Sequence, residues 1–225
     1  MRTIVYIDGF NFYFGVLKNT AYKWLDIVGL VKHVCHIQNP TLDVVAVKFF
    51  TAPVITRVAT QGEKALQSQQ SYFKALLNTH PETIEIINGY YILEKGSPPR
   101  YKQPIDKQDR VEVWRLEEKQ TDVNIALQLY RDAALKHCEH AVLVSSDSDL
   151  EPALAFLRQD FPDYPIGLIL PRREPNETKQ RPPNSNLSGL ANWTRTYIRN
   201  DELEKFQLPD KVLTKKKPAI KPDYW

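Results

Sequence analysis

Three acidic side chains in this sequence come just after short apolar runs that are typical of buried strands. Asp8 follows the apolar residues 4–7, and Asp147 and Asp149 come shortly after the apolar residues 141–144. In an open parallel α/β sheet, the carboxyl ends of the strands meet at one edge, and ligands bind there. Because clustered carboxylates repel one another, a hard divalent cation is the usual group that holds them together. The sequence therefore predicts a cation site at one edge of a sheet.

A fourth acid, Asp122, opens a helical pattern within residues 117–130. Thr121 is a natural helix N-cap, and an acid in the first turn suits the helix dipole, so Asp122 also has a purely structural interpretation. The predicted order of elements brings this helix start toward the edge of the sheet that carries the other acids. We therefore count Asp122 as a candidate member of the same cluster.

The acids that follow the strands have structural interpretations too. Asp8 could cap a helix that starts near Asn11. Asp147 or Asp149 could cap a helix that begins near Leu150, but one cap needs only one acceptor. This segment places two aspartates and three serines in five residues, which exceeds that need and favours a functional site.

Composition indicates a soluble, cytoplasmic protein without a membrane span. The chain has 225 residues, 42% hydrophobic and 25% charged, with a net charge of only +3, which is compatible with a polyanionic partner without requiring one. No segment approaches the roughly 20 apolar residues that cross a bilayer. Cys35 and Cys138 lie far apart, which argues against a disulfide framework or a zinc site. Trp193, Tyr197 and Ile198 could form core or interface, so a homo-oligomer stays open.

The alternation of apolar runs and amphipathic segments predicts the fold class. Helices are expected from about residue 11 and over 26–37, 61–79, 122–136, 149–159, from 187, and near 201–206. Strands are expected over 3–8, 42–50, 83–87, 111–116, 141–145 and 165–170, and residues 90–93 extend or return the third of them. This order favours an α/β fold, a three-layer α/β/α sandwich with a mainly parallel central sheet.

Two regions stand apart from this pattern. We expect one domain over residues 1–200 and a basic C-terminal extension over residues 201–225, whose tail over 213–225 is mobile or docked only through Tyr224 and Trp225. Residues 94–110 are rich in proline, glycine and charge, and we expect them to form a long exposed loop.

Three short motifs together resemble those of the NYN domain family. They are IDGFN at residues 7–11, TDVNIAL at 121–127 and VSSDSDL at 144–150. They occur in the family's order, and the resemblance covers roughly residues 1–170. NYN domains belong to the PIN-like nuclease superfamily, and this chain most resembles the bacterial LabA-like, DUF88 branch. The resemblance implies a PIN-like, Rossmann-like version of the three-layer sandwich.

The resemblance also implies a metal-dependent ribonuclease that uses Mg²⁺ or Mn²⁺. Carried over by position, the acidic, metal-holding cluster would consist of Asp8, Asp122, Asp147 and Asp149. Asn11 would be the polar residue beside the cluster, and Ser146 a small hydroxyl that supports a ligand or the loop. The products would be a 5′-phosphate and a 3′-hydroxyl.

A nuclease needs positive charge around its acidic centre to bind the substrate. Lys119 precedes Asp122, Lys48 lies near the end of its predicted strand, and Arg172 follows the strand over 165–170. We expect these residues to contact single-stranded RNA, the predicted partner. Lysines and arginines in the long loop are better explained as solvated surface charges.

Other functions remain alternatives at this point. The domain could bind RNA or a protein partner in regulation without cleaving anything. A haloacid-dehalogenase-like phosphohydrolase usually carries a second aspartate two residues after the first, but Phe10 stands there. A receiver-like module needs a phosphoacceptor aspartate after its third strand, and Asn88 follows that strand instead.

Overall fold

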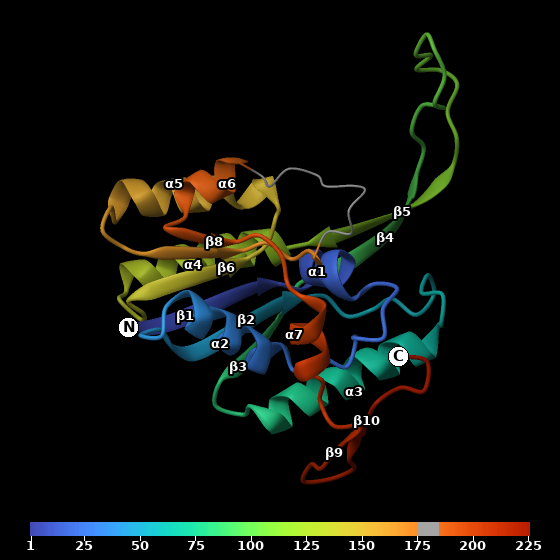
Figure 1. Cartoon of the computed structure of the whole chain (residues 1–225). Helices are drawn as coiled ribbons and strands as arrows, with labels where there is room; N and C mark the ends of the chain where they lie inside the picture. Colours follow the sequence, from blue (N-terminus) through green and yellow to red (C-terminus); the bar gives the residue numbers. More distant parts are fainter. Residues whose placement is uncertain (175–184) are drawn as a thin grey trace.

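The computed structural model describes residues 1–174 and 185–225 and is organised around a six-stranded sheet (Figure 1). Neighbouring strands pair in parallel, in the order β3-β2-β1-β6-β7-β8. The strands are β1 (Arg2–Asp8), β2 (Asp43–Thr51), β3 (Ile84–Asn88), β6 (His140–Val144), β7 (Ile166–Ile169) and β8 (Trp193–Arg195). The predicted parallel sheet is confirmed, with the short β8 as a strand that sequence patterning did not predict.

Helices cover both faces of the sheet, which confirms the three-layer α/β/α sandwich (Figure 1). Residues of the first group of helices share one hydrophobic core: α1 (Gly9–Phe12), η1 (Tyr13–Leu17), α2 (Ile27–Gln38), α3 (Glu63–Thr79) and α7 (Asn200–Lys205). Residues of the second group share the core on the other face: α4 (Thr121–Ala134), η2 (Ser148–Leu150), α5 (Glu151–Asp160) and α6 (Ser185–Leu190). No helix in the described part of the chain is long and apolar enough to span a membrane.

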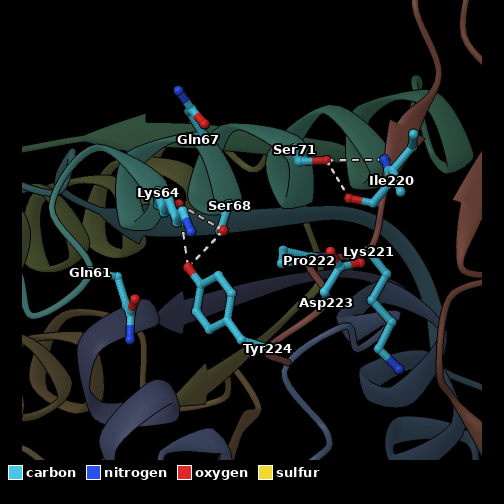
Figure 2. A pocket seen from close by; sticks show the side chains of 10 residues that line it. All are labelled: Gln61, Lys64, Gln67, Ser68, Ser71, Ile220, Lys221, Pro222, Asp223 and Tyr224. Atoms are coloured by element: carbon cyan, nitrogen blue, oxygen red, sulfur yellow. Dashed lines mark hydrogen bonds between the residues drawn. The ribbon is translucent and has the colours of Figure 1, made fainter.

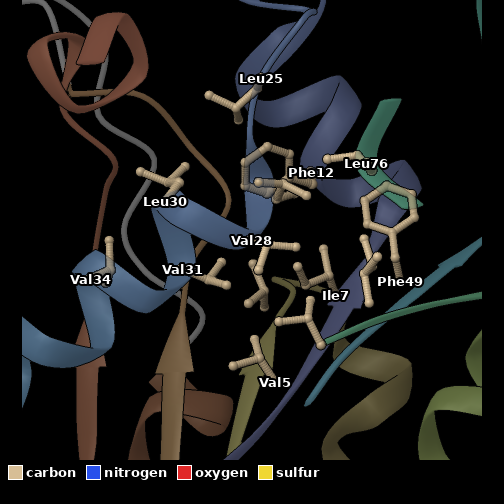
Figure 3. Packing of buried hydrophobic residues seen from close by; sticks show 14 of the residues in the cluster. Val5, Ile7, Phe12, Leu25, Val28, Leu30, Val31, Val34, Phe49 and Leu76 are labelled. Carbon is tan, nitrogen blue, oxygen red and sulfur yellow. The ribbon is translucent and has the colours of Figure 1, made fainter. Parts of the chain in front are cut away.

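Alternation along β1 explains why both faces are covered. Val5 and Ile7 pack with α2 in the first core, as Figure 3 shows, whereas Ile4 and Tyr6 belong to the second. Side chains alternate between the two faces of a strand, so a strand that is buried on both faces must be apolar at successive positions. The continuous apolar run at the start of the chain therefore becomes a central strand.

The strand order reverses direction between β1 and β6. From β1, the chain first builds outward through β2 and β3 and later builds the other half through β6, β7 and β8. Ile7 pairs with Val144, so the two strands end side by side. In open α/β sheets, ligands bind in the crevice beside such a reversal. The topology thus marks the carboxyl ends of β1 and β6 as the place to look for a site.

A two-stranded hairpin leaves the body of the domain on the α1 side (Figure 1). It consists of β4 (Tyr90–Gly96) and β5 (Val113–Lys119), paired antiparallel, and we call it the arm. The prediction of a long exposed loop over 94–110 is confirmed for the arm's tip. The predicted strand over 111–116 is displaced, because the pairing with β4 extends to Lys119.

The C-terminal residues are more closely integrated than a basic extension would be. Leu203, Leu208 and Val212 are buried in the first core. Figure 2 shows the last segment lying along α3, where both the amide and the carbonyl of Ile220 bond to Ser71 Oγ. The sequence suggested that the tail docks only through Tyr224 and Trp225. The structure shows that the tail also contacts α3 through Ile220. A short hairpin, β9 (Lys211–Val212) with β10 (Ala219–Ile220), turns the chain back onto α3.

Candidate functional site

Three of the four predicted acids meet beside the strand reversal. Asp8 ends β1, Asp122 lies in the first turn of α4, and Asp147 precedes η2. Each can offer one carboxylate oxygen such that these oxygens all lie within 4.8 Å of one another. Three elements, the first more than 100 residues from the other two in sequence, thus place three acids around one point.

Asp8 is the most deeply placed of the three, with 2% of its surface exposed. Its Oδ1 accepts a hydrogen bond from the amide of Asn11 (2.9 Å) and caps α1, while its Oδ2 accepts one from Ser145 Oγ (2.9 Å). Gly9 lets the start of α1 pass close to β2, because a Cβ there would lie 2.5 Å from the carbonyl oxygen of Phe50. The backbone of β1 and α1 therefore fixes the orientation of this carboxylate.

The loop after β6 is held by side chains that bond to its own backbone. Ser145 Oγ accepts from the amide of Asp147 (3.0 Å), and Asp147 Oδ1 accepts from the amide of Asp149 (3.0 Å). Asn11 Oδ1 accepts from both the amide (3.2 Å) and the hydroxyl (2.6 Å) of Ser146. Asn11 and Ser146 thus connect α1 to this loop, beside the acids they were predicted to support.

The start of α4 differs from the prediction. Thr121 is not the N-cap, because Gln120 precedes the helix with a left-handed backbone (φ 78°) and makes no capping bond with its side chain. Glu118 acts instead, since its Oε1 accepts from the amide of Thr121 (3.1 Å) and from the Thr121 hydroxyl. This arrangement ties β5, and therefore the arm, to the turn that presents Asp122.

Asp8 and Asp122 lie in an environment that disfavours their negative charge. Burial raises the pKa of Asp8, despite the opposing hydrogen bonds from Asn11 and Ser145. Burial, followed by the charges of Asp8 and Asp147, raises the pKa of Asp122 from 3.8 to about 6. A cation would relieve both the repulsion and the desolvation. The cluster is therefore compatible with a positively charged ligand.

The donor set fits a hard divalent cation. Carboxylate oxygens are preferred by Mg²⁺ and Mn²⁺, whereas zinc and iron sites usually include imidazole or thiolate. Within the described residues, the cluster contains only aspartates. This oxygen-only donor set favours the magnesium and manganese class.

Asp149, the fourth predicted acid, lies outside the group of three. It is exposed and does not share the 4.8 Å cluster. Its charge still contributes to the raised pKa of Asp122, after burial and the charges of Asp8, Asp147 and Glu118. Asp149 therefore borders the site without converging on its centre.

Lys48, predicted to bind substrate, makes its closest polar contact away from the acidic cluster. Its Nζ lies 2.6 Å from Asp132 Oδ2, which also accepts from the Tyr6 hydroxyl (2.8 Å). Asp132 follows Asp122 by ten residues on the same helix, which corresponds to about 15 Å. Lys48 pairs with Tyr6, which lies two positions before the end of β1. The Lys48 ammonium therefore contacts the far end of α4 instead of the cluster.

The other two predicted basic residues each have a protein partner. Lys119, at the root of the arm, lies 2.5 Å from Glu117 and its side chain is 42% exposed. Arg172 Nε donates to the carbonyl of Thr196 (2.9 Å), and the Arg172 backbone passes beside Gly15 of η1. Both remain predictions as substrate-binding residues.

Two residues of the site escaped prediction from the sequence. Ser145 bonds to Asp8 and to the backbone of Asp147, and its position directly after a buried strand was the available signal. Glu118 had no such signal, because its role depends on how the arm returns to the domain.

Comparison with known proteins identifies a family, a relative and a neighbour in fold. The model of the NYN domain family matches residues 2–179. The 6-hydroxy-3-succinoylpyridine 3-monooxygenase of Pseudomonas putida is 38% identical over 242 aligned positions, which span 100% of this chain and 75% of that protein. A crystal structure of a Vibrio parahaemolyticus protein of unknown function has a TM-score of 0.53 at 15% identity, covering 92% of this chain and 96% of the other; this likeness concerns the fold alone.

Proposed function

The chain belongs to the NYN domain family, and on that premise we propose that it is a metal-dependent nuclease that hydrolyses phosphodiester bonds in RNA. The observation that carries the proposal is the convergence of Asp8, Asp122 and Asp147 at the strand reversal. The family's place in the PIN-like nuclease superfamily supports a hydrolase.

The three aspartates would hold Mg²⁺ or Mn²⁺. When bound, such a cation lowers the pKa of a coordinated water and neutralises charge on the phosphate. Asp149, exposed at the border, would hold a second cation or orient a water. Asn11 and Ser146 keep the loop after β6 in place, so that the carboxylates do not need to reorganise when the substrate arrives.

The protein's own residues would also position the RNA. Lys119 and Arg172 would offer positive charge for phosphates on either side of the cleaved bond. No covalent nucleophile is needed, because water is the attacking group. We propose a single-stranded substrate, since a flexible strand can bend so that one phosphodiester enters the acidic centre while its unpaired bases contact the protein.

A cleavage assay tests the proposal. Single-stranded RNA of mixed sequence is incubated with the protein in Mn²⁺, Mg²⁺ or EDTA. We expect metal-dependent cleavage that is lost in Asp147→Asn and kept in Asp163→Asn, an exposed aspartate outside the cluster. Thermal unfolding of both variants confirms that they are folded. Cleavage that persists in Asp147→Asn refutes the assigned site.

A regulatory module that binds RNA without cleaving it is the alternative within the same family. It predicts equal RNA binding by the wild type and Asp147→Asn, with no products in any metal. The intact acidic cluster favours cleavage, because binding alone would not require three acids beside a negatively charged strand.

The Pseudomonas putida relative motivates a second candidate, oxygenation of a hydroxylated pyridine. Such a reaction needs dioxygen and an electron donor. The oxygen-only cluster differs from the two-histidine, one-carboxylate set of non-haem iron oxygenases, which makes the nuclease the better supported function. Oxygen uptake with 6-hydroxy-3-succinoylpyridine and a reduced nicotinamide tests the alternative directly. Substrate-dependent uptake that survives Asp147→Asn would place that chemistry elsewhere in the protein.

A further inference from the structure

We propose that one face of the arm is a binding surface for the single-stranded substrate, on which bases stack at Trp114 as the strand approaches the acidic centre. This inference rests on the proposed nuclease function and specifies where the substrate lies. It is carried by three features of the arm: its register, its exposed aromatic side chain and its attachment to the site.

The register places a continuous apolar strip on one face. Tyr91 pairs with Glu118, Leu93 with Leu116, and Lys95 with Trp114. Residues that pair directly in an antiparallel ladder lie on the same face, and alternate residues along each strand share it. Tyr91, Leu93, Leu116 and Trp114 therefore form one strip, which we call the arm strip.

The outer end of the arm strip is unusually open for such large side chains. Trp114 is 69% exposed and Leu116 is 45% exposed. The guanidinium of Arg57, from the loop before α3, lies 5.3 Å from the centre of the Trp114 ring. An exposed indole with an arginine beside it supplies both stacking area for a base and positive charge for its phosphate.

The inner end of the arm strip reaches the acidic centre. The ring of Tyr91 packs edge-on against Phe10 with centroids 5.6 Å apart, and Phe10 follows Asp8 by two residues. Glu118 bonds to Thr121, the residue before Asp122. Trp114 lies four residues from Glu118 along β5, which corresponds to about 13 Å of strand. A strand held at Trp114 would therefore reach the acids within a few nucleotides.

A second copy of this chain is the other occupant that such a strip could attract. The cores of protein–protein interfaces are depleted of charged residues. Here Arg57 and Lys95 lie at the exposed end of the strip, and its inner end is continuous with an acidic centre. Nucleic acid matches this combination of ring, cation and neighbouring phosphodiester chemistry better than a protein surface does.

Trp114→Ala in the full chain tests the inference. Binding of a labelled single-stranded RNA of about 12 nucleotides is measured by fluorescence anisotropy in EDTA, where the proposed nuclease is inactive. We expect a loss of affinity of roughly 5- to 150-fold, the range for removing one stacked base contact. Trp114→Phe, which keeps a ring, and Phe156→Ala, an exposed aromatic on α5, should stay within about twofold of the wild type.

Two further readouts separate binding from folding and chemistry. The chain has four tryptophans, and Trp114 is the exposed one. RNA should therefore quench the tryptophan fluorescence of the wild type but not that of Trp114→Ala. In Mn²⁺, Trp114→Ala should cleave the labelled RNA with a lower kcat/KM, because its KM rises while kcat stays the same. Cleavage of a dinucleotide, which is too short to reach Trp114, should be unchanged.

The outcomes distinguish this inference from the proposed function. If the wild type binds and cleaves RNA and Trp114→Ala equals it in affinity, the arm strip is not a substrate surface, although the nuclease assignment stands. If Trp114→Ala converts a dimer to a monomer in sedimentation velocity with unchanged RNA affinity, the strip contacts a second copy and the inference is overturned. If the wild type neither binds nor cleaves RNA, both proposals fail.

Discussion

Replacing Asp122 by asparagine should make the metal-free protein more stable near neutral pH and remove its response to divalent cations. Asp122 lies partly buried beside Asp8 and Asp147, and its pKa is raised to about 6. A raised carboxyl pKa means that the folded protein binds a proton more tightly than the unfolded chain. Stability therefore falls as pH rises from about 4 to about 6, and the full penalty is present above that window.

The size of the effect follows from the pKa. The rise from 3.8 to about 6 corresponds to at most about 3 kcal/mol of unfolding free energy. Asp122 is partly exposed, so solvent screening reduces this figure to about 1.5 kcal/mol. Asparagine also gives up the favourable interaction of a charge with the start of α4, worth about 0.5 kcal/mol. A net gain of about 1 kcal/mol remains, which is a rise in Tm of about 2–4 °C for a chain of this length.

Thermal unfolding of Asp122→Asn and wild type in EDTA, at about pH 7.5 and about pH 4.5, measures this gain. The difference should shrink at the lower pH, where Asp122 is protonated in the folded wild type. Asp149→Asn is the matched control from the exposed border of the site and should change Tm little. The reasoning is refuted if Asp122→Asn is not stabilised at the higher pH, or if its gain is the same at both.

Further predictions concern the cation, the loop and the far end of α4. Saturating Mn²⁺ should raise the wild-type stability by about 2.7 kcal/mol at a hundredfold excess over Kd, and EDTA should reverse the change. Below about pH 6 the Mn²⁺ affinity in calorimetric titrations should fall by about tenfold per pH unit, because the proton on Asp122 competes with the cation. Ser145→Ala should lower the free energy of unfolding by about 1.5–3 kcal/mol in urea titrations and also reduce cleavage, because the fully buried hydroxyl donates to Asp8. Lys48→Met should destabilise the protein by about 3–5 kcal/mol, since it leaves Asp132 without its cation, yet kcat of the folded fraction should not change. A large fall in kcat for Lys48→Met would return Lys48 to the substrate-binding residues.

The sheet could be predicted because its strands are buried on both faces. Residues 4–7 and 141–144 are apolar without interruption, and that pattern fits few structures other than central parallel strands. The arm was only partly predictable, because its strands are exposed and mix charges with apolar side chains. The sequence around Trp114 and Glu118 does not indicate which strand β5 pairs with, because that pairing forms across the long tip of the arm.

Basic residues were harder to assign than acids. Acids that follow buried strands are brought together by the sheet itself, so their spacing in sequence does not matter. A lysine near a strand end carries no such constraint, because a shift of one or two positions along the strand changes its face or its reach. Lys48 illustrates this point, since its register opposite Tyr6 directs it to Asp132.

The structural and functional interpretations of the acids turn out to be compatible. Asp8 does cap α1 through Oδ1, and Asp147 does accept from the amide of Asp149, as a purely structural role requires. An ionised carboxylate has about four lone-pair positions, so one capping bond leaves others for a cation. The capping bonds also hold the carboxylates in fixed orientations, which a cation site needs. One aspartate between a strand and a helix can therefore both cap the helix and bind a cation. A capping aspartate should not be discounted as a candidate metal ligand.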